Sequence, residues 1–206
     1  RVRKALAMGI DRSVIARAML APLGIVPEPL NNHVFMANQS GYQDNAGEVG
    51  RYNPQRAAEL LDEAGWGLDD DVRRKDGEPL EIAFVIPAAV PVSRQEAELV
   101  QNLLGQLGVT VIINTVPLND FFETYVTPGQ FDFTLFSWIG TPYPVSSIKS
   151  VYFNPTVNTD GELDILQNYA RVGSEAIDDL LVRHRRSVGK ECVDLVKCWW
   201  QPGQVE

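Results

Sequence analysis

Cysteine and histidine are scarce in this sequence, which contains two of each among 206 residues. Cys192 and Cys198 lie six positions apart, and within one helix their side chains would point to different faces, too far apart for a disulfide. His33 and His184 lie far from each other in the sequence, so no combination has the spacing of a zinc site. We therefore expect two unpaired thiols, no metal centre and no bound cofactor.

Basic residues and long apolar runs are also few. The 18 lysines and arginines stand against 27 acidic residues, and the net charge of −9 disfavours both a nucleic-acid surface and adhesion to an anionic membrane. No run approaches the roughly 20 apolar residues that a transmembrane helix requires. A leader is absent as well, because the sequence opens with Arg1 in what reads as a helix already under way. We expect a piece of a longer protein.

The usual signatures of catalysis are missing too. There is no GxSxG, HExxH, P-loop or GxGxxG motif. The acidic pairs Asp62-Glu63 and Asp178-Asp179 lie on predicted helices, where adjacent side chains diverge and cannot share a proton. Two carboxylates that meet only in the folded chain would leave no such signature. We predict that the protein is not an enzyme, and an α/β hydrolase-like enzyme stays an alternative.

What the sequence does contain is an alternation of apolar strands and amphipathic helices from residue 80 onward. Strands and helices at these spacings are typical of two right-handed crossovers on one sheet, which makes the fold class α/β. The first two strands carry apolar residues on both faces and are expected in the sheet interior. The predicted segments are strands 80–87, 109–116 and 131–138, a helix from the Ser93–Glu96 capping box to Leu107, and a shorter helix over 120–126 capped by Asn119.

Three further helices are expected outside this alternation. Residues 2–20 have one broad apolar face, and Asp11 is expected to divide them into two helices by capping the second. Asn53-Pro54 places an N-cap residue before a proline at the first helical position, which is a clear helix start. Ser174 is expected to cap the last helix.

The stretch FDFTLFSWIGTPYP, residues 131–144, joins the third predicted strand to a bend rich in proline. Ligands in open α/β sheets collect at the carboxyl ends of the strands. The bend offers aromatic and hydroxyl side chains and no reactive group, which is typical of a binding wall. The candidate residues are Trp138, Thr141, Tyr143, Ser146 and Ser147. Packing of Trp138 in the core is an equally good interpretation of that residue.

Residues 21–52 have no periodicity and are rich in proline, asparagine, glutamine and glycine. A loop of this length inside a compact domain is more often functional or linking than decorative. We take His33, Gln39 and Tyr42 as further candidates for lining a ligand site. A segment that only wraps the surface explains the same composition equally well.

Several motifs in this order resemble the family-5 extracellular solute-binding proteins, the oligopeptide- and dipeptide-binding components of ABC importers. VRKALAMGIDRSVIARAML resembles the first helix of that family's second lobe, and YNPQRAAELLDEAGW resembles a specific segment that follows it. DGEPLEIAFVIP, AELVQNLLGQLGVTVIINTV and QFDFTLFSW match in the same order. FSWIGTPYPVSSIKSVY and NHVFMANQSGYQDN resemble an actinobacterial lipoprotein branch more closely than the enterobacterial peptide binders.

The resemblance implies a periplasmic-binding-protein-like (type II) lobe, with a mixed sheet flanked by helices and long irregular loops. Residues 1–181 would be the second lobe of a two-lobed protein, and residues 182–206 a C-terminal helical tail, truncated or altered. Trp138 matches the family's tryptophan, whereas Thr141 stands where peptide binders carry an aspartate for the peptide's amino terminus. That difference puts ordinary peptide specificity in question.

The function implied by the resemblance is that of the substrate-binding component of an ABC transporter, which takes up peptides or another polar solute. Its partners would be the ligand and the ABC permease subunits, and its place the cell envelope or exterior, with a lipid anchor in the parent protein. An alternative is a solute-binding-like lipoprotein that regulates cell-envelope assembly through protein contacts.

Overall fold

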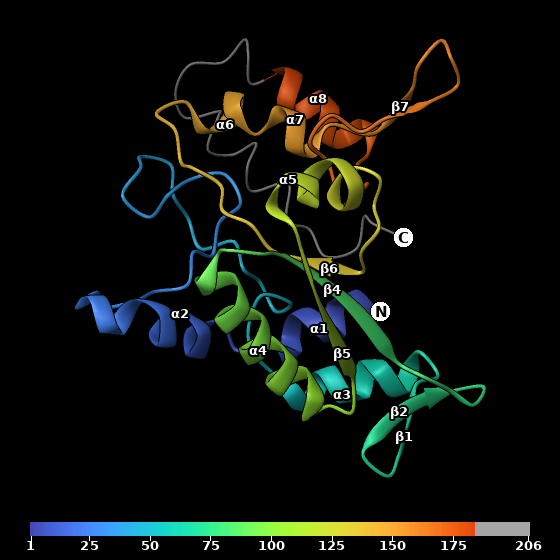
Figure 1. Cartoon of the computed structure of the whole chain (residues 1–206). Coiled ribbons are helices and arrows are strands. Elements are labelled where there is room, and N and C mark those ends of the chain that lie inside the picture. The colour runs from blue at the N-terminus through green and yellow to red at the C-terminus, as the bar shows by residue number, and fades with distance from the viewer. Residues whose placement is uncertain (184–206) are drawn as a thin grey trace. The chain divides into compact units, whose positions relative to one another are not determined.

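The computed structural model describes residues 1–183, and the chain divides into two compact units. Unit 1 consists of Arg1–Pro29 and Gly47–Ser137. Unit 2 contains Leu30–Ala46 together with the chain from Trp138 onward. Both units combine helices with short sheets, so the predicted α/β class is confirmed (Figure 1). The chain passes between the units at three points, and two of these points enclose the irregular segment 30–46.

The main sheet of unit 1 has the strand order β5-β4-β6 and is parallel throughout. The central strand β4 (Glu81–Pro87) pairs along its whole length with β5 (Thr110–Val116), from Glu81 opposite Thr110 to Pro87 opposite Val116. On its other side β4 pairs with β6 (Phe133–Thr134). The predicted alternation of strands and helices on one parallel sheet is therefore confirmed, and β4 is an interior strand as expected.

Two expectations about the flanking strands are wrong. Of the predicted strand 131–138, only Phe133 and Thr134 form a strand, paired with Phe84 and Val85 of β4. The strand predicted over 109–116 exists, but within the described chain it lies at the sheet edge and not in the interior. Its Ile112 is 44% exposed.

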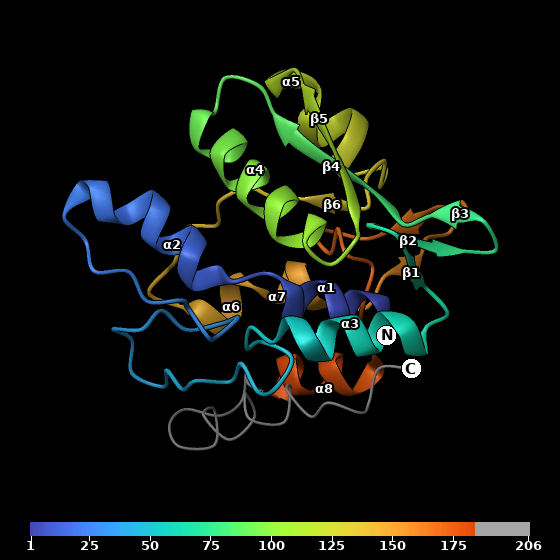
Figure 2. The same cartoon turned by 90° about the horizontal axis from the view of Figure 1, so that it is seen from below.

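Helix α4 (Pro91–Gly105) connects β4 to β5 and lies along one face of both strands (Figure 2). The predicted capping box is wrong: the helix begins at Pro91, its N-cap is Val90, and Ser93 is buried inside the first turn. Proline at the first helical position has its φ preset for helix and needs no N–H partner, so the helix starts three residues earlier than a cap at Ser93 would place it.

The shorter helix after β5 is present as α5 (Leu118–Asp120) followed by a π-helical turn, η2 (Phe121–Val126). The predicted cap at Asn119 is wrong, since Asn119 lies within α5 and Pro117 precedes the helix. The buried side chains of Phe121 and Val126 fix η2 in the core.

The N-terminal helices follow the sequence prediction closely. Helix α1 (Val2–Gly9) ends before Asp11, and α2 (Arg12–Leu20) begins just after it. The Asp11 carboxylate accepts the N–H groups of Ser13 and Val14 at 2.9 and 3.2 Å, which confirms its capping role. A short 3-10 turn, η1 (Ala21–Leu23), follows α2.

Replacing Asp11 by alanine should free these two N–H groups and destabilise α2 by about 1 kcal/mol. We expect amide hydrogen exchange in α2 to become roughly fivefold faster, because exchange reports local opening. Helix α3, capped independently by Asn53, serves as the internal control and should exchange as before. Unchanged exchange in α2 would contradict the capping role.

The core of unit 1 lies between the sheet, α4, α1 and α3 (Pro54–Glu63). Asn53 caps α3 by accepting the N–H of Arg56 at 3.0 Å, and Pro54 stands at the first helical position, both as predicted. Helices α1 and α3 lie side by side, and the half-buried Trp66 packs against the same core. The side chains at the centre of this core are fully buried: Ala5, Ala57, Leu61, Phe84, Ile86 and Ala97.

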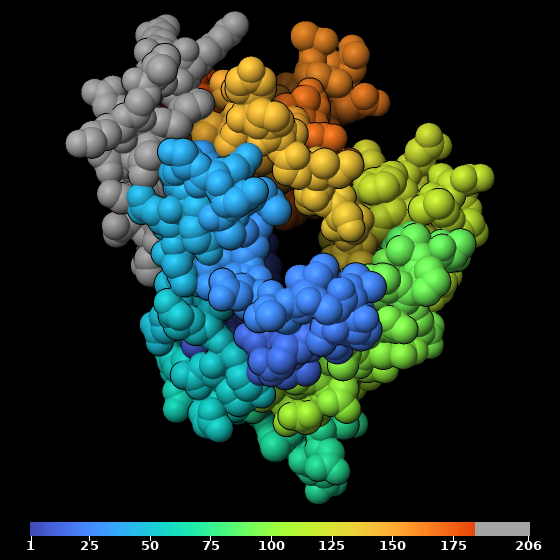
Figure 3. Space-filling view, turned by 90° about the vertical axis from the view of Figure 1, so that its left-hand side faces the viewer, coloured from blue at the N-terminus to red at the C-terminus, as the bar shows by residue number. Residues whose placement is uncertain are grey.

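A small antiparallel sheet follows α3 and is not among the strands predicted from the sequence. It consists of β1 (Gly67–Asp69), β2 (Val72–Lys75) and β3 (Glu78–Pro79). The sheet projects from the rest of unit 1, at the lower edge of Figure 3. Most of its side chains are exposed, with Arg73 as the buried exception.

Unit 2 contains short helices and hairpins around a small apolar core. Its elements are α6 (Pro144–Ser147), α7 (Lys149–Tyr152), β7 (Thr156–Val157), β8 (Leu163–Asp164) and α8 (Glu175–Arg183). Phe35, Val145 and Leu181 form the buried centre. Buried Asn168 donates to the carbonyl oxygens of Phe153 and Val172 at 2.9 and 2.8 Å and so holds the loop before α8.

Helix α8 begins where Ser174 predicts, and the Ser174 hydroxyl oxygen accepts the N–H of Ile177 at 3.4 Å. Cys192, Cys198 and nearly all of the predicted tail 182–206 lie outside the described residues. Within residues 1–183, no helix is long and apolar enough to cross a membrane. The same residues contain no cluster of three side chains suited to hold a metal ion.

Candidate ligand-binding site

The segment 30–46 has no helix or strand, and a buried asparagine fixes its conformation. The Asn32 side-chain oxygen accepts the N–H groups of Val34 and Phe35, both at 2.7 Å. Its amide nitrogen donates to the carbonyl oxygen of Gln43 at 2.9 Å, which closes the segment into a loop. Asn32 is only 5% exposed, and its bond to the Phe35 N–H is buried. Phe35 is thereby directed into the core of unit 2.

The bend after the third strand is organised by hydroxyl groups. The Thr141 hydroxyl and the Ser147 hydroxyl lie 2.9 Å apart, and Ser147 donates to the carbonyl oxygen of Pro144 at 2.9 Å. Helix α6 begins at Pro144, where the fixed φ of proline suits a helix start. Thr141 and Ser147 therefore shape the bend through their mutual bond.

Gln39 joins the segment 30–46 to this bend across about a hundred residues of sequence. Its side-chain nitrogen donates to the carbonyl oxygen of Thr141 at 2.7 Å, while its side-chain oxygen accepts the N–H of Met36 at 2.9 Å. Gly140 lies against Met36 so closely that a β-carbon there would stand 2.9 Å from Met36 Cγ. The two segments of unit 2 are thus packed and hydrogen-bonded to each other.

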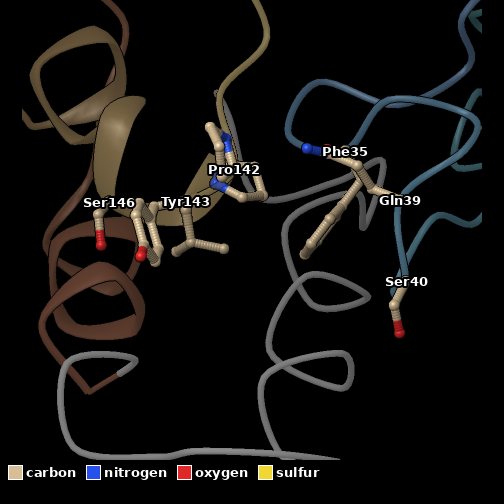
Figure 4. A pocket seen from close by; sticks show the side chains of 8 residues that line it. Phe35, Gln39, Ser40, Pro142, Tyr143 and Ser146 are labelled. Atoms are coloured by element: carbon tan, nitrogen blue, oxygen red, sulfur yellow. The ribbon is translucent and has the colours of Figure 1, made fainter.

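A pocket of about 460 Å³ opens between these two segments, within unit 2 (Figure 4). This volume lies in the range usual for small-molecule sites. The residues that line the pocket come from the segment 30–46, from the bend and from the first turn of α6: Phe35, Gln39, Ser40, Pro142, Tyr143, Pro144, Val145 and Ser146.

Three of the predicted site residues line this pocket, namely Gln39, Tyr143 and Ser146. Thr141 and Ser147 contribute through the hydrogen bonds of the bend. Trp138 is not among the lining residues, and at 54% exposure it is not a core residue either.

His33 and Tyr42 lie elsewhere in unit 2. The ring of His33 meets that of Tyr152 edge-on with centroids 6.4 Å apart, and Tyr42 packs against the apolar core. Burial raises the pKa of the Tyr152 phenol to about 12, so this group stays neutral at physiological pH.

The sequence-based reasoning missed five lining residues: Phe35, Ser40, Pro142, Pro144 and Val145. Proline and valine carry no ligand chemistry of their own, so their place in the wall follows only from the folded bend. Ser40 lies directly beside the candidate Gln39, and the loop signal that selected Gln39 applies to it equally. Phe35 reads as an ordinary apolar residue in a loop.

The described residues of the wall are suited to binding a solute. Its functional groups are an aromatic ring, a phenol, two hydroxyls and an amide that already bonds within the protein. A nucleophile needs an activating base within hydrogen-bonding reach. The eight lining residues include neither a carboxylate nor an imidazole.

Comparison with known proteins agrees with this chemistry. The family described as "Bacterial extracellular solute-binding proteins, family 5 Middle" matches residues 1–160. The oligopeptide-binding protein OppA of Mycobacterium tuberculosis (strain ATCC 25618 / H37Rv) is 41% identical over 182 residues, which is 88% of this chain and 29% of OppA. The nickel-binding periplasmic protein of Escherichia coli (strain K12) is 38% identical over 63 residues, 30% of this chain and 12% of that protein.

Solved structures agree on the fold. The periplasmic EDTA-binding protein EppA superposes with a TM-score of 0.78 at 22% identity, covering 97% of this chain and 36% of EppA. The oligopeptide-binding protein AppA of Bacillus subtilis, solved with a nonapeptide, superposes with a TM-score of 0.73 at 22% identity, covering 97% of this chain and 38% of AppA. These likenesses confirm the predicted periplasmic-binding-protein-like fold.

The matched relatives are solute-binding proteins and not enzymes, and the chain spans less than a third of the length of OppA. The family match covers residues 1–160, a range that includes all eight described pocket residues, and the similarity to OppA covers 88% of the chain. The predicted family is therefore confirmed: this chain belongs to the bacterial extracellular solute-binding proteins of family 5.

Proposed function

We propose that this chain forms part of the substrate-binding component of an ABC importer and binds peptides or another polar solute. Residues 1–181 act as the second lobe of a two-lobed protein, with residues 182–206 as a C-terminal tail. The ligand contacts the pocket of unit 2, and closure of two lobes on the ligand is the signal that the permease reads.

The observation that carries this proposal is the 41% identity to the oligopeptide-binding protein OppA over 88% of the chain. The pocket supports it independently, because aromatic area with a few orienting hydroxyls is the usual lining of a solute site. The partners are then the solute and the ABC permease subunits. The extracellular character of the family supports a location outside the membrane, and we propose a lipid anchor in the parent protein.

The direct test is native mass spectrometry of the full-length protein, purified without refolding. A bound peptide or other solute, released on denaturation and bound again on addition, is the expected result. If the protein carries no solute and binds none from a peptide library, yet retains a cell-envelope protein as partner, the regulatory lipoprotein is the correct assignment and the importer proposal fails.

Tyr143 is the best single residue for testing the site. Its side chain is 77% exposed and lies at the pocket wall, so truncation removes contact area without opening a core cavity. Loss of a well-placed aromatic contact typically costs on the order of 1–2 kcal/mol of binding free energy. Tyr143→Ala should weaken the affinity for the released solute roughly tenfold in isothermal titration calorimetry.

Tyr52→Ala is the matched control for this substitution. Tyr52 is also exposed, at 43%, but it belongs to unit 1 and does not line the pocket. The control should bind with unchanged affinity. If Tyr143→Ala binds as tightly as Tyr52→Ala, the pocket is not the site.

A further inference from the structure

None of the described residues that line the pocket carries a charge. Five of its eight residues are apolar or aromatic, and the other three, Gln39, Ser40 and Ser146, are neutral polar residues. The Gln39 amide is engaged at both ends, with the carbonyl oxygen of Thr141 and the N–H of Met36. Among the described lining residues, the Ser40, Ser146 and Tyr143 hydroxyls are the other side-chain groups able to form hydrogen bonds with a ligand.

We propose that this pocket takes an uncharged, mainly apolar group of the bound solute. The inference rests on the proposed function and adds the chemical class of the group that the pocket accepts. The pocket rejects ammonium, guanidinium and carboxylate groups.

The physical reason is the cost of removing a charge from water. A charged group that loses hydration without gaining an opposite charge is strongly disfavoured, whereas an apolar group gains free energy for each unit of surface buried. Hydroxyls supply some compensation, but none of the eight lining residues supplies a counter-charge.

The net charge of −9 is the strongest reason to expect the opposite preference, for cations. Its effect at the pocket is limited, because charges separated by more than about 8 Å are largely screened at physiological ionic strength. A local counter-charge decides the specificity of a small site, and the described lining has none.

The test is a position scan with pentapeptides. An alanine pentapeptide carries one leucine, lysine or glutamate at each position in turn, and its affinity for the full-length protein is measured by calorimetry at physiological salt. At one position we expect the leucine peptide to bind about tenfold more tightly than the lysine and glutamate peptides, from the cost of partly burying an unpaired charge. Equal affinities at every position, or a preference for lysine, overturn the inference and leave the proposed function standing.

A second experiment tests whether the preference for an uncharged side chain arises in this pocket, by introducing a charge into its wall. Ser146 lines the pocket, and Ser146→Asp places a carboxylate in its wall. Thr159→Asp adds the same charge at an exposed position near the β7–β8 turn, outside the lining residues, and serves as the matched control. Relative to this control, Ser146→Asp should raise the affinity for the lysine peptide about tenfold and lower that for the glutamate peptide.

The outcomes separate the two proposals. If Ser146→Asp and Thr159→Asp bind the lysine peptide with the same affinity, the pocket does not hold the scanned side chain and the inference is wrong. If no peptide and no released solute binds to the wild-type protein, the proposed function fails, and the inference fails with it.

Discussion

Arg73→Met is expected to lower the free energy of unfolding of unit 1 by about 3 kcal/mol, a large effect for a residue of a peripheral strand. Arg73 lies in β2 and is only 3% exposed. Methionine keeps most of the apolar stem and loses all of the hydrogen-bond donors, so the substitution isolates the contribution of the guanidinium.

The guanidinium joins three parts of unit 1. Its Nε donates to the carbonyl oxygen of Leu107 at 2.7 Å, and one terminal nitrogen donates to the carbonyl oxygen of Trp66 at 2.7 Å and to the Asp62 carboxylate at 2.5 Å. Removing it leaves two carbonyl oxygens without this donor, each at a cost of about 1–3 kcal/mol where water cannot replace it. Relief of the cost of burying a charge offsets part of this loss.

Gly108 shows how closely the chain approaches this residue. A β-carbon at Gly108 would lie 3.1 Å from Arg73 Cγ and 2.6 Å from a methyl carbon of Leu68, and the φ of +80° there favours glycine. The Arg73 N–H also donates to the Gly108 carbonyl oxygen at 2.8 Å. The end of α4 is therefore docked on β2, and Arg73 holds this junction.

Urea denaturation followed by far-UV circular dichroism measures the effect, and hydrogen exchange of the β4 amides assigns it to unit 1. Arg74→Met is the matched control, because its side chain is 41% exposed and its ion pair with Asp69 spans 3.4 Å. An exposed pair of this kind contributes about 0–1 kcal/mol. A loss below 1 kcal/mol for Arg73→Met would show that the guanidinium bonds do not stabilise the junction.

Local signals in the sequence predicted the helices of unit 1 well. Asp11 and Asn53 both cap as expected, because an N-cap depends only on a side chain and the N–H groups two or three residues later. The same kind of signal failed at Ser93 and Asn119. In both places a proline lies upstream and the helix begins there, so the polar residue falls inside the first turn.

The strand predicted over 131–138 failed for a reason that is not local. Apolar character allows a run to form a strand, but pairing requires a neighbour, and β4 pairs with only two of these residues. The run also ends at the boundary of the two units, between Ser137 and Trp138. The residues after this boundary belong to a different core, which the sequence pattern does not reveal.

The candidate site was predictable in its chemistry but not in its assembly. The bend predicted Tyr143 and Ser146, since a turn after a strand keeps polar side chains at the surface. The loop predicted Gln39 without indicating its partner. The bond from Gln39 to the Thr141 carbonyl oxygen joins residues 102 positions apart, and only the folded chain reveals such a pair.

Asn32→Ala is the second substitution with a large expected effect, and it acts on the site itself. The change deprives the N–H groups of Val34 and Phe35 and the Gln43 carbonyl oxygen of their partner in one step. The hydrogen bond that the Phe35 N–H donates to Asn32 is buried, so water cannot replace it when it is lost. We expect unit 2 to lose about 2–3 kcal/mol of stability.

A second substitution at Asn32 tests its amide group, and a substitution at Asn38 serves as the control. Asn32→Asp keeps the two accepting bonds, but it buries a carboxylate without a counter-charge and sets an oxygen against the Gln43 carbonyl oxygen, so at neutral pH its loss of stability should be at least as large as that of alanine. Asn38→Ala removes an exposed asparagine from the same segment and should change stability by less than about 0.5 kcal/mol. Urea denaturation of all three variants gives the comparison.

Ligand affinity distinguishes a positioning role from a merely stabilising one. Asn32 does not line the pocket, but it directs Phe35, which does, and it closes the loop that carries Gln39. If Asn32 positions the wall, Asn32→Ala should bind the released solute at least tenfold more weakly at a temperature where circular dichroism shows it fully folded. If the folded variant binds like wild type, Asn32 contributes to stability alone, and the pocket keeps its shape without this bond network.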